Sequence, residues 1–512
     1  MTPLTEAPPT APPLPASQLA ASRQGLADVT AALAGAVDTA LAARRPTGPI
    51  PAGRPEDVLK AAADALGAQE LPTEGLGTRA ALELLTTVLV EYGIDLSHPR
   101  AAAHLQPPAL AVAVAADTLA GVTNASLDTY DSGPSAIAVE RWLIGVLTRL
   151  ARFGERADGV LTPGGSLSNL LALLLARDAA AHRRGIDARR HGIAALPGPV
   201  VFCSELAHFS THRACAALGL GEAAVRPLPV DAHRRMRPDA LRQALGSLGP
   251  EHTPVAVVAT AGTTDYGSVD PLPEIAEIAA EHGVWTHVDA AYGFGALFSD
   301  RLADRLTGLE LADSVTLDLH KIGWQPAACG VLLVSDTTAF TALDRHVAYL
   351  NPADDADAGY DGLLGRSLQT TRRPDAVKAA ATLLAHGREG LGRMVDACHA
   401  LARHAERRVR AEPALELVAP AELTTVVFRY RTADPAAADE INGALRRRLL
   451  ETGTALVGRT EDATAGPGSP QRVCLKLTLL NPTATTTDID GLLDTVIEAG
   501  RTCERLAEEG AA

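Results

Sequence analysis

The sequence predicts an α/β protein built around a large, mostly parallel sheet, and three observations lead to this fold class. Apolar runs of strand length alternate with helical segments, as in a parallel sheet that helices cover on both faces. Glycines and polar residues follow the ends of these runs, where open α/β sheets bind their ligands. The composition, 47% hydrophobic and 21% charged, is that of a globular protein.

Length and charge narrow the organisation and the partners. With 512 residues the chain is too long for one small core, so two or three structural units are expected. Its net charge is −15, from 46 Lys plus Arg against 61 Asp plus Glu. An acidic chain without basic runs is a poor candidate for binding nucleic acid or an anionic membrane, and it weakly favours cationic substrates.

The sequence also bears on the compartment. We expect no apolar run to approach the ~20 residues that span a bilayer, and residues 1–17 lack the basic start of a signal peptide. The six cysteines are scattered without any Cys-x-x-Cys pair, which predicts no metal site and no redox motif. We therefore expect a soluble cytoplasmic protein with reduced thiols.

The first part of the chain predicts helices outside the sheet. Residues 1–50 form an extension, largely disordered or helical, in which the proline-rich residues 1–17 carry too little apolar surface to order and residues 18–43 suit a helix. Residues 51–110 form an N-terminal helical arm. Its helices begin near Pro55, a residue favoured in a first turn, and near Thr78.

The remainder divides into a large domain, residues 111–375, and a small C-terminal α+β domain, residues 376–512. In the large domain, helices are expected over 109–120 and 134–151, before the strand–helix alternation begins. The polar segment 349–366 is predicted as a loop. The predicted strands are residues 159–161, 200–204, 255–259, 284–288 and 314–317 in the large domain, with 424–430 and 473–479 in the small one.

One lysine follows the last of the large-domain strands. That strand stops at Asp318, and His320-Lys321 precede a glycine and a proline that prevent a regular helix. Lys321 thus stands beyond the carboxyl end of a strand, where a partly desolvated lysine acts as a Schiff-base nucleophile. The alternative is a solvated surface lysine on a turn.

Other polar features follow other strands. Gly164-Gly165-Ser166 opens a helix, so its free N–H groups suit a phosphate, although such turns also open ordinary helices. His208 follows a second strand and Asp289 a third; their alternatives are a structural histidine and a helix-capping residue. A lysine, a carboxylate, a flat side chain and a phosphate cradle together are what pyridoxal phosphate requires.

Five motifs carry a family resemblance: Thr162–Asn169, Ala207-His208, Ala259–Thr264, His287–Tyr292 and Asp318–Lys321. From about His98 to its end, the chain resembles the group II pyridoxal-phosphate decarboxylases, which include glutamate and aromatic amino acid decarboxylases. It is most similar to the branch of diaminobutyrate decarboxylase and the siderophore-pathway lysine decarboxylases. That branch is indicated by His98–Pro108, Ser126–Asp131, Ser367–Arg373 and Leu475–Pro482.

The resemblance implies a cofactor site, pyridoxal 5'-phosphate, on a fold of type I (aspartate-aminotransferase-like), in a homodimer with active sites at the interface. Lys321 would be the Schiff-base lysine, Asp289 the partner of the pyridine nitrogen and His208 the residue stacked on the ring. The other implied cofactor contacts are Gly164, Gly165, Ser166 and His320 at the phosphate, Ala291 on the opposite ring face, and Thr263 close by.

The substrate end is less determined. Lys476 stands where glutamate decarboxylases carry an arginine for the substrate carboxylate, and Asp131 is our candidate for a second, cationic amino group. Tyr360 is the candidate proton donor. Asp131 as a helix cap and Tyr360 as a packing residue of a closed loop remain alternatives. We predict decarboxylation of a diamino acid (2,4-diaminobutyrate, ornithine or lysine); an acidic substrate, or an oxidase or aminotransferase on the same fold, stays open.

Overall fold

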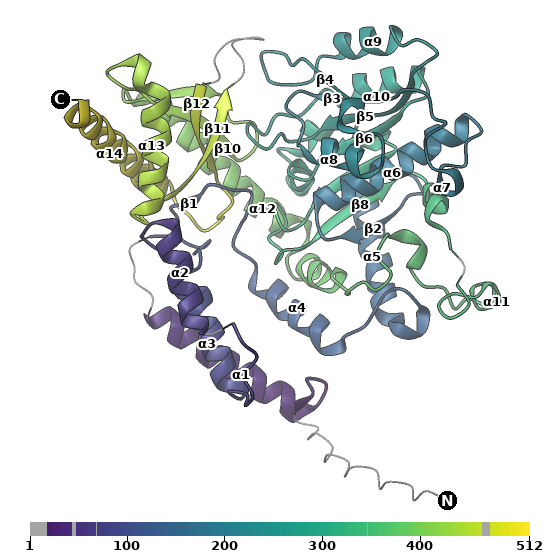
Figure 1. Ribbon diagram of the computed structural model, residues 1–512, viewed down its shortest axis with the longest axis horizontal. Coiled ribbons are helices and arrows are strands. Elements are labelled where there is room, and N and C mark those ends of the chain that lie inside the picture. The colour runs from purple at the N-terminus through teal and green to yellow at the C-terminus, as the bar shows by residue number, and fades with distance from the viewer. Residues whose placement is uncertain (1–17, 44–47, 68, 346, 463–471, 512) are drawn as a thin grey trace, which may run out of the picture.

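The structure is a computed structural model that describes residues 18–43, 48–67, 69–345, 347–462 and 472–511. Figure 1 shows a large sheet domain, a smaller domain that contains the C-terminus, and a helical arm that projects from the body. The expected disorder of residues 1–17 lies outside the described residues.

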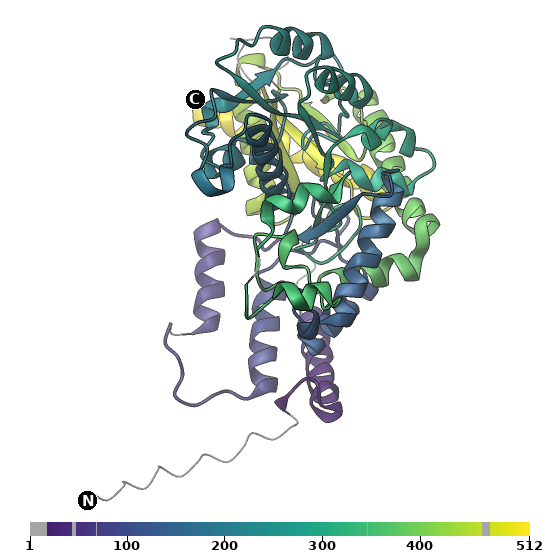
Figure 2. The same cartoon turned by 90° about the vertical axis from the view of Figure 1, so that its right-hand side faces the viewer.

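The arm consists of helices that stand away from both domains (Figures 1 and 2). Helix α1 (Arg23–Ala43) packs along α3 (Thr78–Glu91), and α2 (Pro55–Leu66) lies between them in the chain. Pro55 stands in the first turn of α2, as predicted, because a first-turn residue has no intrahelical partner for its N–H group.

The prediction that no apolar run approaches the length of a bilayer span was wrong. Residues 23–42 of α1 are 20 residues with a mean hydropathy of 1.3, long and apolar enough by length and composition to cross a membrane. Only 17% of this stretch is buried in the chain itself. Core helices of soluble proteins pass the same test, so the finding by itself assigns no membrane.

The large domain contains, within the described residues, a seven-stranded sheet in the order β2-β8-β7-β6-β5-β3-β4. β8 is antiparallel to both of its neighbours, and the strands from β7 to β4 are parallel. The predicted mostly parallel sheet is therefore confirmed. Its strands are β2 (Asp158–Thr162), β3 (Pro199–Ser204), β4 (Val225–Leu228), β5 (Thr253–Thr260), β6 (Trp285–Asp289), β7 (Ser314–Asp318) and β8 (Gly330–Val334).

Each face of this sheet has its own apolar core. Along β8, Val331 and Leu333 join one core while Leu332 and Val334 join the other, and all four are fully buried. Figure 1 shows α6 and α8 against the sheet. The helices of this domain are α4 (Ala111–Thr123), α5 (Pro134–Leu150), α6 (Gly165–Arg183), α7 (Ala188–His191), α8 (Ser210–Ala217), α9 (Pro238–Gly246), α10 (Leu272–Glu281) and α11 (Ala353–Asp357).

Two connections differ from the simple alternation. Short 3-10 helices between Gly293 and Leu311, not an α-helix, join β6 to β7. A Cβ on Gly293 would lie 2.2 Å from the carbonyl oxygen of Ala261, so the chain can pass this close to its neighbour only with a glycine at that position. The segment 349–366, predicted as a loop, contains the short helix α11. The four aspartates of this segment had not indicated a helix.

The small domain packs helices on a mixed sheet that, as far as the chain is described, has five strands in the order β1-β11-β12-β10-β9. Helix α12 (Ala376–Ala411) joins the domains: Ala376 and Ala379 lie in the large-domain core, Leu401 and Ala405 in the small-domain core. The other elements are β1 (Ala101–Ala102), β9 (Leu415–Ala419), β10 (Thr425–Tyr430), β11 (Leu456–Asp462), β12 (Arg472–Thr478), α13 (Ala438–Glu451) and α14 (Thr486–Ala511).

Candidate active site

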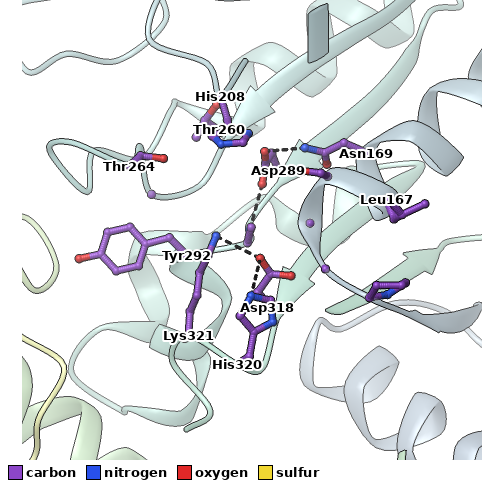
Figure 3. A pocket seen from close by; sticks show the side chains of 16 residues that line it. Leu167, Asn169, His208, Thr260, Thr264, Asp289, Tyr292, Asp318, His320 and Lys321 are labelled. Atoms are coloured by element: carbon purple, nitrogen blue, oxygen red, sulfur yellow. Dashed lines mark hydrogen bonds and ion pairs between the residues drawn. The ribbon is translucent and has the colours of Figure 1, made fainter. Parts of the chain in front are cut away.

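A pocket of about 330 Å³ opens at the carboxyl ends of the large-sheet strands (Figure 3). Loops after β2, β3, β5, β6 and β7 line it, which is where parallel sheets bind ligands. The structure therefore brings together segments that lie up to about 150 residues apart in the chain. The sequence-predicted residues on its wall are Gly164, Gly165, Ser166, His208, Asp289, Ala291, His320 and Lys321.

Lys321 is positioned by a tight turn after β7. The N–H of Trp324 donates to the carbonyl of Lys321 at 3.2 Å, and the indole N–H of Trp324 donates to the carbonyl of Leu480 at 2.9 Å. Trp324 is fully buried, so the turn cannot swing out without exposing a large apolar ring. The lysine is thereby held with its amine in the pocket, as Figure 3 shows.

The amine of Lys321 is paired. Its Nζ lies 3.0 Å from Oδ2 of Asp318, the buried last residue of β7. The ring of His320 approaches the same carboxylate at 3.7 Å, and its Nδ1 accepts from the backbone N–H of Cys329 at 3.2 Å. Sequence reasoning placed Asp318 at the end of the strand but gave it no role, because the pairing depends on how the turn folds back.

Asp289 ends β6 with its carboxylate at the pocket and its side chain almost fully buried. Its Oδ2 accepts from Nδ2 of Asn169 at 2.8 Å, and its Oδ1 accepts from the backbone N–H of Ala291 at 3.1 Å. Such donors satisfy the oxygens of a buried carboxylate. The carboxylate is therefore fixed toward any protonated nitrogen that enters the pocket.

His208 lies between β3 and α8, and Figure 3 shows it above Asp289 and Lys321. Burial lowers the pKa of His208; the Lys321 charge acts in the same direction, and Asp289 opposes both. The imidazole is therefore neutral near pH 7, a flat uncharged ring facing the pocket. Its Nδ1 lies 2.9 Å from Oγ of Ser210.

The glycines at the start of α6 leave room for an anion. A Cβ on Gly164 would lie 3.3 Å from His320 Cε1, and one on Gly165 would lie 3.0 Å from Asp318 Oδ2 and 3.1 Å from Ala291 Cβ. Backbone N–H groups at a helix N-terminus and the positive end of its dipole favour a phosphate. With a lysine, a buried carboxylate and a neutral flat ring beside this cradle, the residues fit pyridoxal phosphate.

Thr263, predicted to lie close to the cofactor, faces elsewhere. Its side chain is buried with Oγ1 2.7 Å from Oγ of Ser268, and its neighbours Thr264 and Thr260 line the pocket instead. The turn from Gly262 to Ser268 is closed by backbone bonds, which rotate Thr263 away from the wall. Strand alternation did not reveal this, since the residues lie in a turn.

Lys476, predicted for the substrate carboxylate, stands on β12 at the edge of this region. Its Nζ lies 2.7 Å from Oδ1 of Asp265 and 3.4 Å from the carbonyl of Thr264. It does not line the pocket itself, but it holds the loop that does. Its assignment to the substrate stays a prediction.

Asp131 and Tyr360 do not line the pocket of their own chain, and Tyr360 packs against Tyr130, the neighbour of Asp131. The rings of Tyr360 and Tyr130 meet edge to face with centroids 5.4 Å apart. The N–H of Leu363 donates to the carbonyl of Leu127 at 2.8 Å, which ties the 349–366 segment to the loop of Asp131. Their roles are not tested by this geometry.

The pocket wall also contains residues to which sequence reasoning gave no role, among them Asn169, Thr260, Tyr292 and Asp318. Asn169 lies in the second turn of α6, which begins at Gly165, and its side chain lines the pocket. The signal was an asparagine inside an apolar helix, where an amide needs a polar partner. Among the described residues no three His, Cys, Asp or Glu side chains are grouped to hold a metal ion.

Comparisons with known proteins agree with this geometry. Residues 70–431 match the pyridoxal-dependent decarboxylase conserved domain. The chain is 43% identical over 438 residues to an L-2,4-diaminobutyrate decarboxylase of Rhizobium meliloti, covering 85% of this chain and 84% of that protein. It is 35% identical to an L-2,4-diaminobutyrate decarboxylase of Acinetobacter baumannii, with 85% and 86% covered.

Solved structures extend the likeness to the fold. The glutamate decarboxylase domain of a Vibrio parahaemolyticus diaminobutyrate-pyruvate transaminase and L-2,4-diaminobutyrate decarboxylase superposes with a TM-score of 0.81 at 31% identity, covering 93% of this chain and 96% of that one. Mouse CSAD superposes with a TM-score of 0.82 at 27% identity, covering 94% and 99%. The predicted type I fold and the predicted cofactor are confirmed. The chain belongs to the pyridoxal-dependent decarboxylase family and is an amino-acid decarboxylase that uses pyridoxal phosphate.

Proposed function

We propose that the chain removes the α-carboxylate of an L-diamino acid, with L-2,4-diaminobutyrate the first candidate and ornithine and lysine in the same class. The observation that carries this proposal is the 43% identity to a diaminobutyrate decarboxylase over 85% of the chain. The loop before α5 adds support: it offers the carboxylates of Asp128 and Asp131 and contains no arginine for an acidic side chain.

The pocket residues divide the work of the reaction. Bound pyridoxal phosphate supplies a conjugated ring that accepts the electron pair left when carbon dioxide departs. Lys321 would hold the aldehyde carbon of the cofactor, and the carboxylate of Asp289 would hold the proton on the pyridine nitrogen. His208 would cover one face of the ring, and the N–H groups at the start of α6 would bind the phosphate.

The carbon that loses carbon dioxide must then take up a proton. Tyr360 is the proposed donor, because it is a phenol on a Gly- and Asp-rich loop of the kind that closes over active sites. Closure of such a loop expels water and strengthens the electrostatic contacts inside. Tyr360 is 57% exposed in a single chain, so a second copy could contact it.

A homodimer is part of the proposal. Asp131 and Tyr360 lie outside the pocket of their own chain, and Tyr360 packs against Tyr130 beside Asp131, so a second copy would have to supply both residues to the pocket. The arm also exposes an apolar surface that a second copy would cover. Its exposed large apolar side chains include Val29, Leu33, Leu41, Leu59, Leu66, Leu85 and Leu89.

We further propose the cytoplasm as the compartment. All six cysteines are free and buried, and burial raises the pKa of Cys203, Cys215, Cys329 and Cys398 to about 12. Such thiols are unreactive packing residues, as expected of a protein in a reducing compartment.

One alternative has an observation in its favour. A mouse cysteine sulfinic acid decarboxylase is 32% identical over 443 residues, so an acidic substrate is the second candidate. The two candidate substrates differ at their distal end. The second amino group of a diamino acid requires a carboxylate of the protein, and the side-chain anion of an acidic amino acid requires a cationic partner.

The test is to incubate the purified holoenzyme with 2,4-diaminobutyrate, ornithine, lysine, glutamate, aspartate and cysteine sulfinate and to identify the amines by mass. The proposal expects a diamine from one of the first three, carbon dioxide release and no oxygen consumption. Preference for an acidic amino acid would overturn it. Borohydride reduction followed by peptide mapping checks the attachment site, because the pyridoxyl group should be found on Lys321 and on no other lysine.

A further inference from the structure

A series of hydrogen bonds begins at Trp285, the first residue of β6, and leads to the pocket. The indole N–H of Trp285 donates to Oγ of Ser314 at 2.8 Å, and that oxygen lies 2.9 Å from Nδ1 of His287. On the other side of the ring, Nε2 of His287 lies 3.0 Å from Oδ1 of Asn169. His287 and Ser314 are fully buried and Asn169 nearly so.

The hydrogen bonds from Trp285 to Asn169 all run in one direction, from donor to acceptor toward Asn169. An indole N–H can only donate, so Ser314 accepts from Trp285 and its own hydrogen is free for Nδ1 of His287. Burial lowers the pKa of His287 to about 4, although Asp289 opposes the shift, so the ring is neutral. Its hydrogen sits on Nε2, because the carboxylate of Asp289 takes Nδ2 of Asn169 and leaves Oδ1, an acceptor, facing Nε2. Nε2 then donates to Asn169, which fixes the orientation of that amide.

The second half branches at Asn169. Its Nδ2 donates to Oδ2 of Asp289 at 2.8 Å and to Oγ of Ser210 at 2.9 Å. Ser210 accepts from the amide and lies 2.9 Å from Nδ1 of His208, while its backbone N–H approaches the same nitrogen at 3.3 Å. Nδ1 of His208 is thus an acceptor, and its hydrogen sits on Nε2.

We propose that Asn169 is a positioning residue for the cofactor ring, oriented by His287, and that it holds the carboxylate of Asp289 and the Nε2–H tautomer of His208 at the same time. The inference rests on the pyridoxal-phosphate site and deepens it. The amide of Asn169 would thereby link Asp289, at the edge of the cofactor ring, to His208, on the face of that ring. Second-layer residues of this kind fix the tautomer and orientation of the groups that touch a ligand.

The competing explanation is structural: the buried polar side chains of this network satisfy one another and only stabilise the sheet. The two explanations differ in what a substitution changes. A structural role predicts a lower melting temperature with an unchanged site. A positioning role predicts altered cofactor binding and an altered His208 ring in protein that is folded.

The first experiment replaces Asn169 by leucine, which is nearly isosteric. Asn442→Leu is the matched control, because Asn442 is also fully buried and hydrogen-bonded, yet it lies in the small domain, bonded to Tyr430 and Ala438. We expect Asn169→Leu to weaken pyridoxal phosphate binding roughly tenfold or more at pH 7.5, since a hydrogen bond to a charged group is lost. Asn442→Leu should lower the melting temperature without changing the affinity.

The second experiment reads the ring directly. ¹⁵N spectra of histidine-labelled holoenzyme, with His208→Gln to assign the signal, should show a hydrogen on Nε2 of His208 and none on Nδ1. Ser210→Ala should add a clear fraction of the Nδ1–H form, and Ser210→Thr, which keeps the hydroxyl, should restore the wild-type spectrum.

Either of two results would overturn the proposal: Nδ1–H on His208 of the wild type, or Asn169→Leu with the affinity of Asn442→Leu. If Asn169→Leu does not fold, the spectra of the wild type and of the Ser210 variants still show which nitrogen of His208 carries the hydrogen. Neither readout needs a substrate, so failure here is distinguishable from failure of the diamino acid assignment.

Discussion

The ammonium of Lys476 lies 2.7 Å from a carboxylate oxygen of Asp265, on the loop that follows β5. The cation assigned to the substrate carboxylate therefore already has an anionic partner, beside Thr264 on the pocket wall. Lys476 is only 7% exposed, so removing its partner leaves a buried charge that seeks another anion.

This pair predicts a split between two variants. Lys476→Gln should raise KM for the preferred amino acid ~10-fold or more, because a charge-assisted contact to the substrate is lost. Asp265→Asn should leave KM unchanged or lower, since the lysine is then freed for the substrate. Steady-state kinetics of both variants measures this; equal damage by both would mean that the pair only anchors the loop.

Asp289→Asn should retain the cofactor yet lose turnover. The amide still occupies the site held by Asn169 and Ala291, but it no longer carries the charge that keeps the pyridine nitrogen protonated. Loss of such a partner costs ~3 kcal/mol or more, about a hundredfold in kcat. Cofactor content by absorbance and kcat together check this, and a near-normal kcat would contradict it.

Tyr360 should act across the subunit interface. Lys321→Ala and Tyr360→Phe are each expected to be impaired, the second with more carbonyl by-product. When the two proteins are unfolded, mixed and refolded, the mixed dimer has one site with a native Lys321 and the partner copy's native tyrosine. Activity should then rise above that of either variant alone; no recovery, or wild-type behaviour of Tyr360→Phe, would remove Tyr360 from this role.

Asp131 should set the preference for a second amino group. Asp131→Asn leaves the substrate ammonium without a charged partner, which costs ~2 kcal/mol, roughly thirtyfold in kcat/KM. In the structure Asp131 accepts from the hydroxyl of Thr129 at 2.6 Å, so Thr129→Val is a control for a purely local role. If Asp131→Asn keeps the wild-type ratio of diamine precursors to acidic substrates, the assignment fails.

His287 should make stability depend on pH. Burial lowers its pKa from 6.5 to about 4, so between these values the unfolded chain binds a proton that the folded chain does not. Stability is therefore lost as pH falls from about 6.5 toward 4, by on the order of 3 kcal/mol from this group. The decrease in melting temperature from pH 7.5 to pH 5.0 should be smaller in His287→Gln than in the wild type. An equal decrease in both proteins would contradict this prediction.

The parts of the site that follow strand ends could be predicted from the sequence. Lys321, Asp289 and His208 each stand just after an apolar run, and parallel strands bring such ends to one edge. The start of the phosphate cradle was likewise visible as Gly164-Gly165, because glycines mark a close approach of backbone. These residues could be found because local pattern and tertiary position agree.

Contacts that depend on packing across elements could not be predicted. The pairing of Lys321 with Asp318 needs the geometry of a turn, and the bond from Asn169 to Asp289 joins residues on different elements. The orientation of Thr263 depends on a turn closed by Ser268. Alternation of apolar residues carries no information about which way a turn residue faces.

Strand β1 gives this chain a particular order of assembly. Ala101 and Ala102 precede the large domain, yet they pair in parallel with Leu456 and Val457 of β11. During synthesis the edge of the small sheet leaves the ribosome first and must wait for its partner while the whole large domain is made. We therefore expect the large domain to fold early and the small sheet to close last, as a slow step of high contact order.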